Sequence, residues 1–172
     1  MLSTPDIHFR PLHSDEWAAF RALRLRSIAD MPEAIYPTHA EESSRTPEQI
    51  RARITETTHQ VVLGAYQGEE LIGIAGLRRE ALVQVAHKGI LWGVFVHPER
   101  RGGGIARRLL HALFDYARKV GVRQIHLSVN VDNPRAGNLY RSMGFESYGR
   151  EPDAMQVGGR YYDEDLMVLR LC

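Results

Sequence analysis

The stretch RRGGGIARRLLHALFDYARK, at positions 100–119, places three consecutive glycines directly before a run of helical character. Apolar side chains recur in this run at helical spacing, at Ile105, Leu109, Leu113, Tyr116 and Val120. Gly121 follows as a stop signal for a helix. The apolar run KGILWGVFV, at 88–96, comes just before the glycines and indicates a strand buried on both faces. The sequence therefore predicts a strand, a glycine loop and a helix in succession.

A unit of this kind is suited to binding an anion. The first backbone amides of a helix have no partner within it, and the helix dipole adds partial positive charge at the same end. Glycine lets a phosphate approach the backbone because no Cβ stands in the way. Four arginines flank the loop, namely Arg100, Arg101, Arg107 and Arg108. We therefore expect the loop to hold a pyrophosphate, the alternative being a tight turn that binds nothing.

Two familiar nucleotide-binding patterns do not fit the loop. A Walker A loop ends in Gly-Lys followed by Ser or Thr, and that sequence occurs nowhere in the chain. A dinucleotide fingerprint on Gly102 and Gly104 requires glycine or alanine at position 107, which is Arg107. The prediction is thus a phosphate cradle of another class.

Hydrophobic periodicity and turn residues divide the rest of the chain into alternating strands and helices. Ser14 is the expected cap of the first helix, residues 31–46 are expected to be irregular, and Trp17 and Trp92 are expected in the core. We expect strands at 7–10, 61–66, 71–77, 88–96, 123–132, 145–151 and 161–171, and helices at 14–31, 47–57, 104–120 and 134–143. This order predicts a single mixed α/β domain over residues 1–172.

Composition argues against several classes of function. The net charge of +1 gives no overall attraction to nucleic acid or to an acidic membrane, so neither is an expected partner. The single cysteine, Cys172, cannot form a disulfide framework, and the eight histidines show no metal-binding spacing. The first residues lack an apolar stretch of secretory type, and no window reaches the length of a membrane span. We expect a cytoplasmic protein that needs no metal.

Two motifs give the chain a resemblance to a known family. VFVHPERRGGGIARRLL resembles the acyl-CoA binding motif [QR]-x-x-G-x-[GA] of the GCN5-related N-acetyltransferase (GNAT) superfamily, with Arg101, Gly104 and Ala106 in the defined positions. NPRAGNLYRSMGF is similar to the second block of that family, N-x-x-A-x-x-L-Y-x-x-x-G-F. Its matching residues are Asn133, Ala136, Leu139, Tyr140, Gly144 and Phe145. The resemblance covers residues 60–170, and one helix and one strand separate the two blocks, as the family requires.

The resemblance implies a fold and an activity. The fold would be a mostly antiparallel mixed sheet of six or seven strands, splayed between strands 4 and 5 and flanked by about four helices. The activity would be transfer of an acetyl group from acetyl-CoA to a primary amine of a small molecule or peptide, by direct attack in a ternary complex. The implied acetyl-CoA binding residues are Phe95, Val96, Arg101, Gly102, Gly103, Gly104, Ile105, Ala106, Arg107, Asn133 and Tyr140.

The second motif supplies the implied catalytic residue. Asn133, Ala136 and Tyr140 are spaced so that they share one helix face. Tyr140 would act as the general acid that protonates the leaving thiolate, because a tyrosine with its usual pKa of about 10 is protonated at neutral pH. Asn133 would bind the pantetheine arm, and backbone groups of Phe95 and Val96 would bind the arm and polarise the thioester carbonyl. The simpler alternatives are packing for Tyr140 and helix capping for Asn133.

The general base stays open at this stage. Many members of the family place a glutamate on the strand before the glycine loop, and KGILWGVFV has no carboxylate. The alternatives are a water chain, an amine that arrives neutral, or one of five side chains: Glu41, Glu42, Glu80, His87 and Asp132. Glu41 and Glu42 could instead attract a cationic amine or lie in a solvated loop.

The acceptor is the least defined part of the prediction. We expect it to contact residues 31–46, 79–85 and 154–162. Its identity, the preferred acyl group and the assembly state, for which a homodimer is one option, stay open. The rival hypothesis is a non-catalytic domain of the same fold that senses acyl-CoA or binds a partner. The missing strand carboxylate favours that rival, and Tyr140 speaks against it.

Overall fold

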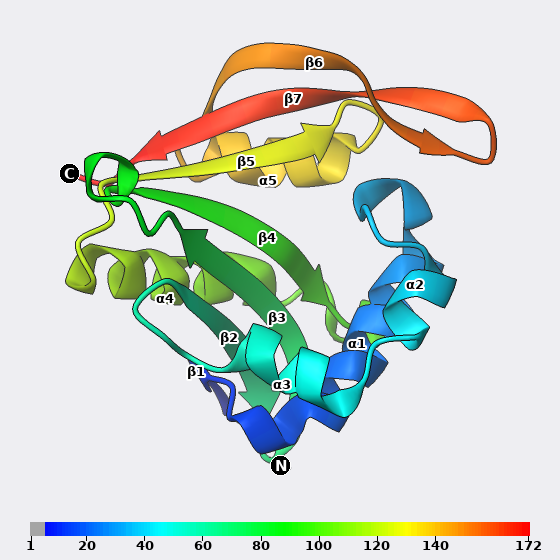
Figure 1. Cartoon of the computed structure of the whole chain (residues 1–172), viewed down its shortest axis with the longest axis vertical. Helices are drawn as coiled ribbons and strands as arrows, with labels where there is room; N and C mark the ends of the chain where they lie inside the picture. The colour runs from blue at the N-terminus through cyan, green and yellow to red at the C-terminus, as the bar shows by residue number, and fades with distance from the viewer. Residues whose placement is uncertain (1–5) are drawn as a thin grey trace.

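Seven strands form one sheet in the computed structural model, which describes residues 6–172 (Figure 1). The strands are β1 (Ile7–Pro11), β2 (Gln60–Gln67), β3 (Glu70–Arg79), β4 (Lys88–Val96), β5 (Gln124–Asn130), β6 (Glu146–Val157) and β7 (Arg160–Arg170). The α-helices are α1 (Trp17–Asp30), α2 (His39–Ser43), α3 (Pro47–Ile54), α4 (Ile105–Lys119) and α5 (Pro134–Ser142). Residues 1–5, on which part of the expectation about a secretory segment falls, lie outside the described residues.

The sheet is split in its middle. Its strand order is β1-β2-β3-β4-β5-β7-β6, and every neighbouring pair is antiparallel except β4 and β5, which run parallel. These two strands pair only over Lys88–Ile90 and Gln124–His126, and then diverge (Figure 1). The predicted mixed sheet, splayed between strands 4 and 5, is confirmed.

A bulge in β4 accompanies the split. Ile74 of β3 lies opposite Phe95 and Gly76 lies opposite Trp92, so two residues of β4 face one residue of β3. Gly93, one of the two, has a φ of 65°, a conformation that glycine adopts without strain. An extra residue bends a strand, and this bulge follows Ile90, the last residue of β4 that pairs with β5.

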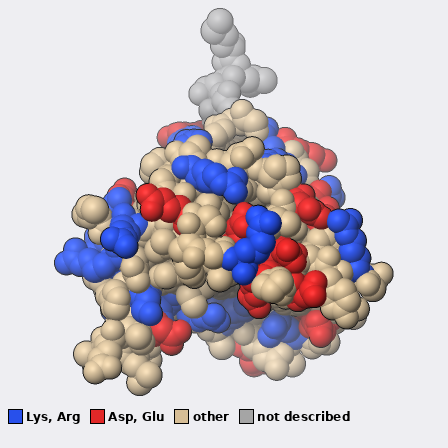
Figure 2. All heavy atoms as spheres, turned by 90° about the horizontal axis from the view of Figure 1, so that it is seen from above, with Lys and Arg blue, Asp and Glu red and all other residues tan. Residues whose placement is uncertain are grey.

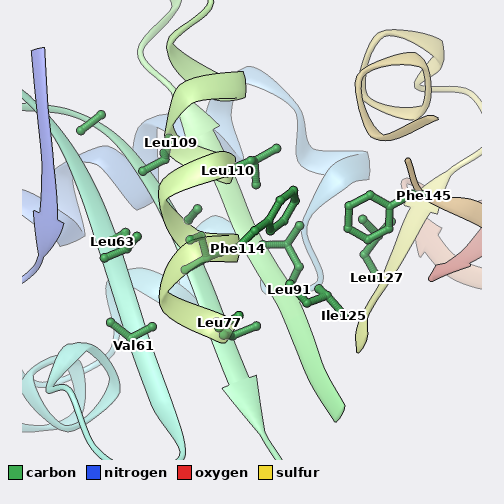
Figure 3. Packing of buried hydrophobic residues seen from close by; sticks show 14 of the residues in the cluster. Val61, Leu63, Leu77, Leu91, Leu109, Leu110, Phe114, Ile125, Leu127 and Phe145 are labelled. Carbon is green, nitrogen blue, oxygen red and sulfur yellow. The ribbon is translucent and has the colours of Figure 1, made fainter. Parts of the chain in front are cut away.

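Two apolar layers hold helices on opposite faces of the sheet. Alternate residues of β2 explain both layers, since Val61 and Leu63 belong to the cluster under α4, whereas Val62 and Tyr66 belong to the cluster under α1 and α3. On the α4 side, the apolar stripe predicted from the sequence is largely buried against β2, β3 and β4 (Figure 3). Gly121 and Gly144, with φ values of 86° and 98°, follow α4 and α5 as predicted.

The N-terminal third departs from the predictions in three ways. Ser14 does not cap α1, because residues 14–16 form a 3₁₀ turn whose start is fixed by the Glu16 carboxylate, which accepts a 2.6 Å bond from the His13 amide. Residues 31–46 are not irregular throughout, since they contain α2, which Thr38 caps with its side chain. Helix α3 ends at Ile54, three residues earlier than predicted.

The two tryptophans are only half-buried. Trp17 packs against the cluster under α1 and α3 at its margin. Trp92 also contacts this cluster, but one side of it forms part of a cavity wall. The expectation that both lie in the core is therefore wrong, because each packs at the edge of the core and stays partly exposed. The exposed side of Trp92 belongs to the candidate site.

Candidate functional site

A cavity of about 820 Å³ lies in the gap where β4 and β5 diverge. One wall is the bulged end of β4, which includes Trp92, Phe95 and Val96, and the opposite wall is the end of β5. The start of α4 and one face of α5 close its sides, and residues before α2 also contribute. The cavity therefore brings together the two sequence motifs and the split in the sheet.

The glycine loop forms one mouth of this cavity. Gly102 and Gly104 have φ values of 94° and 68°, so the left-handed backbone explains two of the three glycines. No atom lies within 4 Å of a Cβ built on any of the three, so the loop presents bare backbone to open space. Among residues 6–172, the amides of 102–107 find no acceptor. Gly102, Gly104, Ile105, Ala106 and Arg107 line the cavity, whereas Gly103 does not.

The flanking arginines are held by protein partners. Arg101 donates from Nε to the carbonyl of Val96 at 3.0 Å and from Nη2 to Asp30 at 2.9 Å, and its guanidinium lies over Phe95. Arg107 donates to the hydroxyl of Ser142, which links α4 to α5. Arg100 pairs with Glu70, and Arg108 donates to the carbonyl of Ile7. In this structure these side chains fix the loop against its neighbours, and Arg101 and Arg107 also face the cavity.

The second motif places one face of α5 on the cavity. Asn133 precedes the helix and its side-chain oxygen accepts a 3.2 Å bond from the amide of Ala136, so the capping role is confirmed. Asn133, Ala136 and Tyr140 all line the cavity, as their spacing predicted. The side-chain nitrogen of Asn133 donates to no acceptor in the described part of the chain and is available to a ligand.

Tyr140 is a half-buried phenol at the inner end of this face. Its ring packs edge-on against Phe145, with 5.6 Å between the ring centroids. Burial raises the pKa of Tyr140 to about 12. The hydroxyl is therefore protonated throughout the neutral range and can donate a proton or a hydrogen bond.

The five side chains considered as general bases lie away from the cavity wall. Glu41 accepts a 2.8 Å hydrogen bond from the Thr38 amide and so helps to cap the start of α2. Glu42 is buried and forms ion pairs with arginines. Asp132 pairs with Arg160 at 2.7 Å. Glu80 follows the end of β3, and His87 precedes β4. The geometry thus brings none of the five to the cavity, although Asp132 precedes the motif residue Asn133.

A carboxylate that sequence reasoning missed does line the cavity. Glu164 of β7 is only 5% exposed and lies opposite Asn130 of β5 in the sheet. The hydroxyl of Tyr36 donates a 2.6 Å hydrogen bond to its Oε2. Burial raises the pKa of Glu164, the nearby Glu151 raises it further, and the hydrogen bond from Tyr36 acts in the opposite direction. No other Asp or Glu among residues 6–172 lines this cavity.

The acceptor segments predicted from the sequence are brought to the cavity only in part. Met31 and residues 34–37 line it, in agreement with the expected segment 31–46. Residues 79–85 and 154–162 supply no part of the wall within the described chain, whereas Arg78 and Glu164, which are close to them in sequence, do line it.

Comparison with known proteins shows the family to which the chain belongs. The family model for the acetyltransferase (GNAT) family matches residues 21–145, so the chain belongs to that family. The chain is 30% identical over 102 residues to spermidine N(1)-acetyltransferase of Vibrio cholerae, and 38% identical over 101 residues to the N-alpha-acetyltransferase RimI of Mycobacterium tuberculosis. Each match takes in 59% of this chain, and the chain spans 57% and 61% of the length of the two relatives.

A solved structure shares the fold over nearly the whole chain. It is yncA, a putative acetyltransferase from Salmonella typhimurium with its cofactor acetyl-CoA. The TM-score is 0.82 at 22% identity, with 97% of this chain and 95% of that chain covered. At this identity the likeness concerns the fold.

Other features of the described residues are limited. Over residues 6–172, no three His, Cys, Asp or Glu side chains gather as metal ligands, and no helix is both long and apolar enough to cross a membrane. Positive and negative side chains are interspersed on the face shown in Figure 2.

Proposed function

We propose that the protein transfers an acetyl group from acetyl-CoA to a primary amine in a ternary complex. The observation that carries the proposal is that the bare glycine loop, the Asn133–Tyr140 face of α5 and the carboxylate of Glu164 all line one cavity. Family membership supports the same class of reaction.

The residues present fit acetyl-CoA as the acyl donor. Unpartnered amides at the start of α4 suit a pyrophosphate, because they combine hydrogen-bond donors with the positive end of the helix dipole. Asn133 offers its side-chain nitrogen to the pantetheine arm. The end of β4 at Phe95 and Val96 lines the cavity where β5 has diverged, with the Val96 carbonyl already accepting from Arg101. Arg101 and Arg107 keep the loop and α5 in place around this arm. Acetyl-CoA supplies the acetyl group in activated form, as a thioester.

Glu164 and Tyr140 divide the proton transfers between them. Glu164 takes a proton from the incoming ammonium, and the neutral amine nitrogen forms a bond to the carbonyl carbon as the carbon–sulfur bond breaks. The second amine proton passes to water, and Tyr140 gives its proton to the departing thiolate. The products are the N-acetyl amine and free coenzyme A.

The proposal is tested by coenzyme A release from acetyl-CoA with a panel of primary amines. We expect release above background with at least one amine. Tyr140→Phe should lower kcat by about 100-fold or more, as loss of a general acid does, while calorimetry should give a dissociation constant for acetyl-CoA within about threefold of the wild type. Tight binding of acetyl-CoA with no release across the panel would contradict the proposal and favour the acyl-CoA sensor.

A further inference from the structure

One part of the cavity is not explained by the transfer reaction itself. Arg24 of α1, Arg53 of α3 and Arg78 of β3 line the wall next to Trp92. Two of them lie on N-terminal helices and the third lies on the strand next to β4. Glu164, by contrast, lies on β7, beyond the split between β4 and β5. The cavity therefore has a basic wall as well as a carboxylate.

Arg24 is buried without a hydrogen bond. The residue is 4% exposed, and its buried Nε donates to no acceptor within residues 6–172. The nearest carboxylate oxygen, Oε1 of Glu42, lies 3.9 Å from Nε, beyond hydrogen-bond distance. A buried polar group without a partner is unfavourable, and a guanidinium offers five donors. This side chain faces a cavity with donors that the protein itself does not satisfy.

The charges around Arg24 do not balance. Glu42, 1% exposed, accepts from Arg53 at 3.1 Å and from Arg45 at 3.4 Å. With Arg24, three guanidinium groups therefore surround one carboxylate. Burial, followed by repulsion from Arg53, lowers the pKa of Arg24 to about 10, so it remains a cation at neutral pH. The cluster carries an excess of positive charge beside the cavity.

Packing fixes Arg24 beside Trp92 and the bulge of β4. Its guanidinium carbon lies 5.7 Å from the centre of the Trp92 ring, on which Arg53 also stacks at 4.6 Å. A Cβ built on Gly93, at the bulge of β4, would lie 3.3 Å from Nη1 of Arg24. The guanidinium thus sits against the backbone where β4 leaves β5, and its position is set before any ligand arrives.

We propose that Arg24 binds the carboxylate of the acceptor, and that the acceptor is an amine that also carries a carboxylate, such as a free amino acid. This inference rests on the proposed function. A carboxylate matches the planar donor fork of arginine in a bidentate arrangement and offsets the excess charge. Glu164, on the other side of the split, receives the amine. A polycationic amine is disfavoured because the basic wall repels it.

The test compares matched pairs of acceptors that differ only in the acid group. Pairs such as L-leucine with 3-methylbutylamine, and L-phenylalanine with 2-phenylethylamine, are assayed for coenzyme A release. We expect the carboxylate member of the preferred pair to have a kcat/KM at least tenfold higher. Calorimetry of the same compounds with the protein saturated with coenzyme A measures the preference without turnover.

Three variants distinguish loss of the carboxylate-binding site from a general disruption of the arginine cluster. Arg24→Met keeps the length of the side chain and leaves Glu42 with two arginine partners, and it should reduce the preference to twofold or less. Arg24→Lys keeps the charge without the fork and should give an intermediate preference. Arg45→Gln is the matched control, since Arg45 belongs to the same cluster but does not line this cavity, and it should retain the full preference.

The outcomes distinguish the inference from the function on which it rests. Equal kcat/KM values and equal dissociation constants for both members of every pair would overturn the inference. Turnover of these compounds would still support the proposed function. A carboxylate preference that survives in folded Arg24→Met would also overturn it. No turnover with any compound, but a carboxylate preference in calorimetry that Arg24→Met removes, would keep the anion site and reject the transferase.

Discussion

The hydroxyl of Tyr36 donates a 2.6 Å hydrogen bond to Oε2 of Glu164, which joins two residues 128 positions apart in the chain. Tyr36 lies between the first helix and α2, and Glu164 lies on β7. The bond therefore connects the N-terminal helical layer to the half of the sheet beyond the split, and both residues line the cavity.

The pH dependence of activity should follow the ionisation of Glu164 and respond to its hydrogen bond from Tyr36. Burial raises the pKa of Glu164, and a general base works only when ionised, so kcat/KM should fall on the acid side as the pH drops through that raised pKa. Glu164→Gln should lower kcat/KM and remove this acid limb. Tyr36→Phe should shift the limb to higher pH, because the hydrogen bond that favours the ionised form is lost. An unchanged acid limb in Glu164→Gln would exclude Glu164 as the base.

The alkaline side should be insensitive to Tyr140. Since the pKa of Tyr140 is raised to about 12, its phenol stays protonated well above neutral pH. We expect a pH profile of kcat with no decline attributable to the phenol up to about pH 10. A decline below pH 9 that is present in the wild type and absent in Tyr140→Phe would contradict this.

The glycines of the loop should differ in their tolerance of a side chain. Gly104→Ala should lower the free energy of unfolding by about 1–2 kcal/mol, because its φ is 68°, and should weaken acetyl-CoA binding by about tenfold. Gly103→Ala is the matched control, since Gly103 has no positive φ and does not line the cavity. Thermal unfolding and calorimetry test both variants, and equal effects of the two would argue against the cradle.

Trp92 lies across Gly76, and its ring occupies the space that a Cβ at position 76 would fill. Gly76→Ala should displace Trp92 from the cavity wall, lower the free energy of unfolding by about 1–3 kcal/mol and raise KM for the amine more than KM for acetyl-CoA. Gly149→Ala, where a Cβ would meet its nearest neighbour at an ordinary 3.7 Å, should leave both quantities nearly unchanged. Denaturant unfolding and initial-rate kinetics provide the comparison.

Glu16 should contribute stability that is lost in acid. Arg10 donates two 2.9 Å bonds to its carboxylate and Tyr66 a third at 2.8 Å. The bonds from Arg10, together with those from His13 and Tyr66, lower the pKa of Glu16 to about 2. A lowered pKa stabilises the fold above the usual pKa and loses this effect as pH falls toward 2. Glu16→Gln should therefore cost about 1–3 kcal/mol near pH 7 and little near pH 2, measured by urea unfolding.

The sequence was sufficient for the framework of the site because its signals are local. The glycine loop, the strand before it and the face of α5 each lie within a short segment, and their left-handed glycines and helical spacing can be read without knowing the fold. The short helix α2 was missed although Thr38 and Glu41 form a capping box, the one local signal that would have indicated it.

The polar residues of the acceptor side could not be predicted in the same way. Glu164 stands within the strand segment YYDEDLMVLRL, where neighbouring Asp and Glu residues resemble an exposed strand face. Its burial arises from the pairing of β7 with β5 and from Tyr36, which are contacts between distant segments. Arg24 likewise looks like a surface residue of α1, and the packing of α2, α3 and β4 encloses it.

The short pairing of β4 with β5 gives this protein a strand edge that faces inward. An exposed edge normally invites pairing with other chains and with aggregates. Here the edge of β4 beyond Ile90 opens into a cavity closed by α1, α5 and the loop before α2. The unpaired backbone of β4 therefore lines an internal cavity and does not form an outer edge of the sheet.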